Sequence, residues 1–165
     1  MSTHAFDWNV VVVGAWNLAI LTPDGIARIL FGLAQGTPVE VELALDRPAA
    51  FRVIHADIAV TPSTNRIIVA PKTCTPDALA QASASAAMAI TSLPMTPVSA
   101  AGINVRYRVD GFSDELLAAL RPGLDDWLGD ARHEVKLRFI RRALRWNEAL
   151  LNIEIQENED ASGSI

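Results

Sequence analysis

The chain has 165 residues, of which 50% are hydrophobic and 20% are charged, with nine glycines and nine prolines. This composition is typical of a globular domain and excludes the disordered and collagen-like classes. The net charge of −5 argues against a general binder of nucleic acid or anionic membranes, because both require an excess of Lys and Arg.

The single cysteine and the N-terminal residues indicate the cellular compartment in which the protein is expected. Cys74 is the only cysteine, so no intrachain disulfide can form and a reducing cytoplasm is the expected location. The N-terminal residues lack the basic start of a signal peptide, and no apolar run reaches the about 20 residues of a membrane helix. We therefore expect a cytoplasmic protein without a membrane anchor.

The first predicted elements are strands followed by a helix. Residues 8–21 are rich in β-branched and aromatic side chains, which indicates a strand or two short strands divided at Gly14. Thr22 and Pro23 are residue types that begin helices, and an apolar stripe follows at helical spacing. Gly36 is the predicted end of this helix.

Three strands are predicted next. Apolar and polar residues alternate over 39–45, and β-branched residues dominate 51–60 and 66–70. Residues 51–60 are predicted as one strand, so His55 and Asp57 share a face of it. The turn-forming residues 61–65 then join this strand to the one that follows.

The second half predicts two more helices and three more strands. A small-residue helix extends from 75 to about 93, the clearest strand covers 99–110, and Ser113 begins a further helix. Alternation predicts strands over 133–142 and near 151–155, whereas the acidic tail 157–165 is expected to be disordered.

These elements follow no regular βα alternation, which favours the α+β class. We predict a largely antiparallel sheet of about seven to eight strands, with three main helices packed on one face. Residues 1–156 are expected to form a single domain.

A basic cluster is the most distinctive charge feature of the chain. One interpretation is a cross-strand charge ladder with Glu40, Glu42 and Glu154, and it is the one we favour. The other is a surface for an acidic protein partner, with Trp146 as an exposed anchor, or for a nucleic-acid backbone, which the lack of a row of aromatic residues on that face disfavours. The residues of this partner surface are Arg106, Arg108, Lys136, Arg138, Arg141, Arg142 and Trp146.

An alternative site is a pocket between sheet and helices that holds a small molecule or supports catalysis. Its candidates are His55, Asp57, Cys74 and Asn104. A thiol just before a helix can be activated by a nearby base, and His55 with Asp57 could supply one. The competing interpretation, which we favour, is a small buried thiol and solvated strand residues.

The sequence contains no motif for phosphate binding, for a serine nucleophile or for metal binding. Neither a phosphate-binding loop nor a serine nucleophile elbow occurs, and the three histidines and one cysteine show no metal-ligand spacing. We therefore predict no catalytic residues, no metal and no cofactor.

Residues 12–20 (VVGAWNLAI) and 93–107 (LPMTPVSAAGINVRY) resemble segments of bacterial proteins of unknown function. The resemblance implies a bacterial family with a shared fold. It implies no activity, substrate or site residue.

The sequence does not establish a function, and the question of an enzyme stays open. The favoured hypothesis is a non-enzymatic interaction or adaptor protein that forms homo-oligomers. The alternative is a small-molecule-binding domain or an enzyme. Apolar composition, strands that leave an open edge, and tryptophans that can anchor a partner motivate the first hypothesis.

Overall fold

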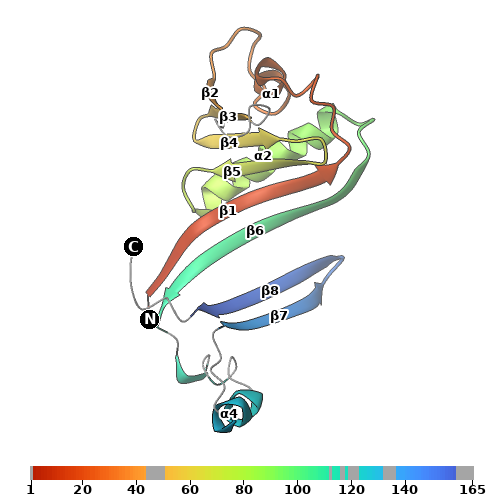
Figure 1. The fold of residues 1–165 in the computed structure, drawn as a ribbon. Coiled ribbons are helices and arrows are strands. Elements are labelled where there is room, and N and C mark those ends of the chain that lie inside the picture. Colours follow the sequence, from red (N-terminus) through yellow and green to blue (C-terminus); the bar gives the residue numbers. More distant parts are fainter. Residues whose placement is uncertain are drawn as a thin grey trace. The chain divides into compact units, whose positions relative to one another are not determined.

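A computed structural model of the chain describes residues 2–43, 51–111, 113–115, 118, 123–131 and 137–158. The chain divides into two compact units, one formed by Thr3–Arg108 and the other by Met1–Ser2 with Val109–Ile165. We call them the sheet unit and the hairpin unit and describe each by itself. The predicted α+β class is confirmed, with a six-stranded antiparallel sheet and a two-stranded sheet (Figure 1).

The six-stranded sheet has the order β2-β3-β4-β5-β1-β6. Strands β2 to β5 form a meander, because strands that follow one another in the chain pair antiparallel. The first strand, β1, lies between β5 and β6, so the two long strands of the sheet are neighbours (Figure 1). The strands are β1 (Ser2–Gly14), β2 (Glu40–Leu43), β3 (Phe51–His55), β4 (Ile58–Pro62), β5 (Arg66–Pro71) and β6 (Val98–Asp110).

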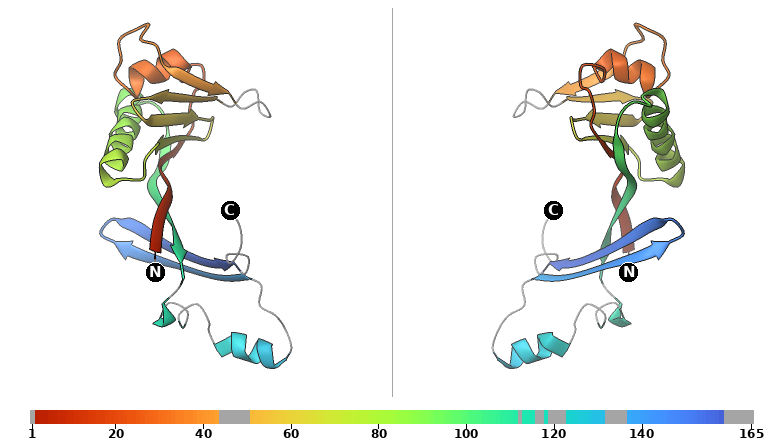
Figure 2. Two further views of the ribbon diagram at one scale, coloured as in Figure 1. Left: turned by 90° about the vertical axis from the view of Figure 1, so that its left-hand side faces the viewer. Right: turned by 90° about the vertical axis from the view of Figure 1, so that its right-hand side faces the viewer.

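Helices α1 (Pro23–Ile29) and α2 (Pro76–Ser92) cover one face of this sheet (Figure 2). Both predicted starts are confirmed, because the hydroxyls of Thr22 and Thr75 accept hydrogen bonds from the backbone N–H groups three residues further on. Between the helices and the sheet lies a core of apolar side chains. Its fully buried members include Val12, Leu21, Ile26, Val53, Val60, Ile67, Val69, Ala82 and Ala89.

Three local predictions are wrong. The segment 51–60 is two strands, because Ala56 and Asp57 have φ of 45° and 66° and form the turn between β3 and β4. Helix α1 ends at Ile29 rather than near Gly36, and Gly32 follows with φ of +66°. Strand β1 begins at Ser2, six residues before the predicted start at residue 8, and it ends at Gly14, so that 15–21 form no strand.

The first part of β1 and the last part of β6 form a two-stranded ribbon. The pairing of β1 with β5 runs from Val10 to Val13, whereas β1 and β6 are each 13 residues long. We call residues 3–9 of β1 and 103–108 of β6 the ribbon. Its stability depends on the contacts between these two strands, because the rest of the sheet and both helices lie beside the other end of β1 (Figure 1).

The hairpin unit contains α4 (Gly123–Asp130), β7 (Leu137–Trp146) and β8 (Ala149–Asn158). The two strands pair antiparallel from Leu137↔Asn158 to Trp146↔Ala149. β7 extends to Trp146, four residues beyond the predicted end at 142, and β8 covers ten residues where a strand near 151–155 was predicted. The two strands meet at a tight turn. Most of the predicted helix after Ser113 lies outside the described residues, as do residues 133–136. Of the predicted tail 157–165, the first two residues belong to β8, and 159–165 lie outside the described residues.

Candidate interaction surface

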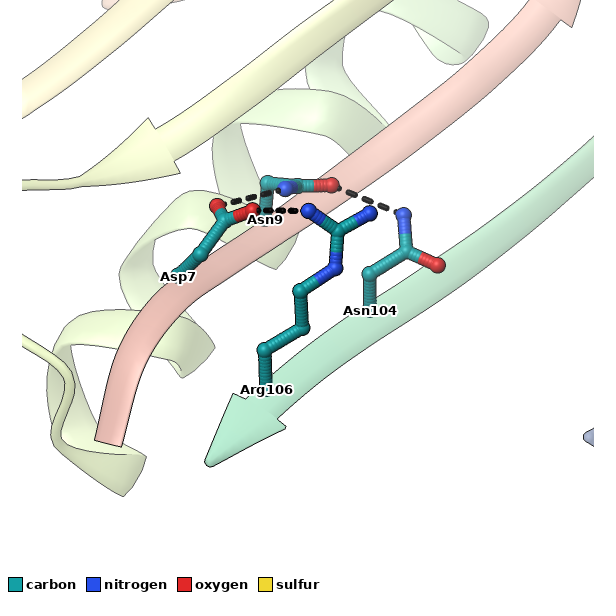
Figure 3. Close-up of polar contacts among 4 residues, drawn as sticks. All are labelled: Asp7, Asn9, Asn104 and Arg106. Carbon is teal, nitrogen blue, oxygen red and sulfur yellow. Dashed lines mark hydrogen bonds and ion pairs between the residues drawn. The ribbon is translucent and has the colours of Figure 1, made fainter. Parts of the chain in front are cut away.

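Polar side chains on one face of the ribbon form a connected network that we call the polar clamp (Figure 3). Arg106 Nη1 donates to Asp7 Oδ2 over 2.6 Å, and Asn9 Nδ2 donates to Asp7 Oδ1 over 3.0 Å. Asn104 Nδ2 donates to Asn9 Oδ1 over 2.8 Å. The four side chains therefore tie β6 to the part of β1 that precedes its pairing with β5.

The opposite face of the ribbon is apolar, since side chains alternate across a strand. Tyr107 meets the indole of Trp8 edge to face, with 5.7 Å between the ring centroids and 72° between the ring planes. The side chains of this apolar strip, apart from buried Trp8, are between 47% and 56% exposed. The strip consists of Phe6, Trp8, Ile103, Val105 and Tyr107.

Trp8 combines burial with an unused donor. Its side chain is only 7% exposed, and its Nε1 is buried without a hydrogen-bond partner among the described residues. Buried polar groups are nearly always hydrogen-bonded, because an unpaired donor keeps the cost of its lost hydration. The ribbon thus contains a buried hydrogen-bond donor, the Trp8 indole N–H, that has no acceptor among the described residues.

The two edges of the large sheet differ. The β2 edge is only four residues long and carries Glu40 and Glu42, and the latter pairs with Arg52 over 3.5 Å. Short, charged edge strands resist pairing with another chain. The β6 edge is 13 residues long and has β1 as its only hydrogen-bonded neighbour in the described sheet.

The predicted partner residues fall in both units. Arg106 belongs to the polar clamp, and the Arg108 guanidinium carbon lies 5.9 Å from the ring centroid of Phe6, within cation–π range. Arg138, Arg141, Arg142 and Trp146 lie on β7 of the hairpin unit. Lys136 lies outside the described residues.

The register of the hairpin supports part of the charge-ladder interpretation. Arg141 is directly opposite Glu154, and Arg138 is opposite Glu157. Arg142 and Arg145 are opposite Ile153 and Leu150, so no carboxylate faces them across the strands. Glu42 pairs with Arg52 within the sheet unit instead.

One face of the hairpin is largely apolar. The register places the pairs Ile140–Ile155, Leu144–Leu151 and Trp146–Ala149 on it, together with Arg142–Ile153 and, at its far end, Arg138–Glu157. Trp146 is 66% exposed, and Leu144, Leu151 and Ile153 are exposed as well. A two-stranded hairpin is marginally stable alone, so this face requires a cover.

The residues proposed for a small-molecule pocket are spread over the sheet unit. The ring centroids of His55 and Phe31 are 5.5 Å apart, and Asp57 lies 3.6 Å from the Lys72 ammonium. Half-buried Cys74 precedes α2. Asn104 belongs to the polar clamp on β6, which strands β5 and β1 separate from β4.

The depression with a volume of about 420 Å³ in the sheet unit contains none of these four residues. It is lined by Ala15, Asn17, Ile20 and residues 92–97. Among the described residues, no group of three His, Cys, Asp or Glu side chains is placed to hold a metal ion. No helix in that part of the chain has both the length and the apolarity needed to cross a membrane.

Sequence reasoning missed Phe6, Asp7, Trp8 and Asn9 as surface-forming residues. Their alternation of apolar and polar types is a period-two signal that extends into the valine run of β1. Reading the strand from this alternation would have predicted two distinct faces. The pairing with β6 lies about a hundred residues away in sequence, and no local pattern reports it.

Comparison with known proteins yields no relative. No protein-family model matches the chain, no curated protein matches it, and no solved structure matches it.

Proposed function

We propose that this protein is a non-enzymatic, self-associating interaction module of the bacterial cytoplasm. The observation that carries the proposal is the apolar strip on the ribbon. Contiguous exposed apolar surface of this kind marks interaction sites, because water contact with it is unfavourable. The half-exposed Ile103, Val105 and Tyr107 lie beside a buried indole, so a second surface could bury them without rearrangement of the core.

The adaptor part of the proposal rests on the hairpin. Its apolar face and the exposed Trp146 offer a second surface, and aromatic residues are common interface anchors. Arg142, which lies on this face and is directly opposite Ile153 rather than a carboxylate, would favour an acidic protein partner. The lone thiol of Cys74 is compatible with a reducing compartment.

The oligomeric mass tests the proposal. Light scattering during size-exclusion chromatography at micromolar concentration should give a mass above that of the 17.8 kDa chain. The variant Ile103→Ser with Val105→Ser should weaken association by roughly tenfold or more, because two apolar side chains lose their burial in each copy.

Met95→Ser is the matched control, since Met95 is the most exposed large apolar side chain among the described residues and lies outside the strip. It should leave the oligomeric mass unchanged. A wild-type protein that elutes as a clean monomer would rule out self-association, and an equal effect of the two variants would rule out the strip as its site.

A further inference from the structure

The outer edge of β6 is the least protected backbone edge of the six-stranded sheet. We propose that two copies of the chain join there, with β6 of one copy paired antiparallel to β6 of the other and Asn104 at the twofold axis. The inference rests on the proposed self-association and names its site and register. The partner that pairs with the β6 edge is thus a second copy of this chain.

The side chains of β6 leave this edge accessible. Natural edge strands are commonly protected by charges, proline, bulges or short length. On β6, Arg106 and Asn104 instead reach back to Asp7 and Asn9 of β1 (Figure 3). The guanidinium of Arg108 lies over the ring of Phe6. The two arginines of the strand are thus held toward its own sheet.

The sequence of β6 is complementary to itself in size. Its first five residues, 98–102, are Val-Ser-Ala-Ala-Gly, whereas 104–110 carry the bulky and charged side chains. Antiparallel pairing about Asn104 sets the small half of each copy against the large half of the other. Arg106 then lies opposite Gly102, Tyr107 opposite Ala101, and Arg108 opposite Ala100 of the second copy.

Charge selects among the registers of a twofold pair. A pair centred on residue 106, 107 or 108 would place an arginine of one copy directly opposite an arginine of the other, which destabilises a sheet. A pair centred on Asn104 has no like charges opposite each other. It also overlaps all 13 residues of the strand, because Asn104 is the midpoint of Val98–Asp110.

The same register joins the two apolar strips. Residues directly opposite across a strand pair lie on the same face, so Ile103 of each copy meets Val105 of the other. The strip therefore continues across the twofold axis, and the interface is isologous. Backbone pairing and apolar burial act at one site.

Two variants that place opposite charges at Gly102 test this arrangement. A Cβ atom at Gly102 would have no neighbour within 4 Å, so the fold of one copy tolerates a side chain there. Gly102→Lys would face Arg106 of the second copy, whereas Gly102→Glu would attract it. We expect dimerisation to be roughly tenfold weaker for the lysine variant, because each dimer contains two such pairs. Equal dissociation constants for the two variants would overturn the register.

Distances between spin labels provide an independent measurement. In a Cys74→Ser background, single cysteines at Ala100, Asn104 and Arg108 each carry one label. In the variant labelled at 104, the backbones that carry the two labels of a dimer should be one strand spacing apart, about 5 Å. In the variants labelled at 100 or at 108, the two labelled positions of a dimer lie eight residues apart along the strands, which is about 27 Å at ~3.4 Å per residue.

The outcomes separate the two proposals. A dimeric mass with the shortest distance at 104 supports both. A dimeric mass without a minimum at 104 overturns the β6 register and leaves self-association standing. A monomeric wild-type protein overturns both.

Discussion

Gly25 shows how a single missing side chain permits the fold of the sheet unit. It lies in the first turn of α1, and its N–H donates to the Thr22 hydroxyl that caps the helix. A Cβ atom at this position would lie 1.9 Å from the carbonyl oxygen of Ile20. The obstructing atom belongs to the backbone of Ile20, so no flexible side chain can move aside to make room.

Gly25→Ala should therefore destabilise the protein by about 1–3 kcal/mol, as overpacked sites do. The matched control is Gly102→Ala, because a Cβ atom there meets no neighbour. Chemical denaturation of both variants measures the difference in the free energy of unfolding. Equal stabilities would show that the 20–25 backbone relaxes without cost.

The Asp7–Arg106 pair is the charged part of the polar clamp. Its side chains are 36% and 61% exposed, so solvent screens the attraction between them. A double-mutant cycle with Asp7→Ala and Arg106→Ala should give a coupling energy of about 0.5–1 kcal/mol, at the upper end for surface pairs because of the short contact.

Asp57 and Lys72 supply the comparison for this cycle. Their charged groups are 3.6 Å apart and their side chains are 49% exposed for lysine and 76% for aspartate. Their coupling energy should be smaller, at about 0–0.5 kcal/mol. A larger value for this pair than for Asp7–Arg106 would mean that the clamp does not hold the ribbon.

At the scale of elements, α2 packs closely because its buried side chains are alanines. Ala82, Ala86 and Ala89 lie in the core, whereas the adjacent Ala87 is exposed. Ala86→Leu should cost about 1–3 kcal/mol through overpacking. Ala87→Leu should change stability by less than about 0.5 kcal/mol, and thermal unfolding of the two variants measures the contrast. Similar costs would contradict a tight helix–sheet contact.

Elements with strong local signals were predictable from sequence. The capping threonines, the alanine-rich helix and the alternation in β6 each identified an element. The turn at Ala56 and Asp57 was missed because both residues adopt positive φ without the Gly or Asn that normally marks such a turn. The polar clamp was missed because it joins residues about a hundred positions apart, and such pairing depends on tertiary structure.

At the scale of the whole molecule, self-association links stability to concentration. Any interaction made only by folded chains stabilises the folded state by mass action. If the proposed dimer forms, a hundredfold rise in protein concentration should raise the melting temperature by roughly 3–5 °C. Scanning calorimetry at several concentrations measures this slope.

The Ile103→Ser with Val105→Ser variant is the control for that slope. Its melting temperature should be nearly independent of concentration, because association no longer contributes. A wild-type melting temperature that is flat across the same range would contradict the coupling between folding and association.

The contrast between the two edges of the large sheet has a consequence for assembly size. A strand edge can accept one neighbour, and the charged, four-residue β2 edge does not invite a second. Once two β6 strands have paired, neither copy presents another long edge of that sheet. Growth through this sheet would stop at two chains, so the same backbone groups that permit association would also prevent fibre formation.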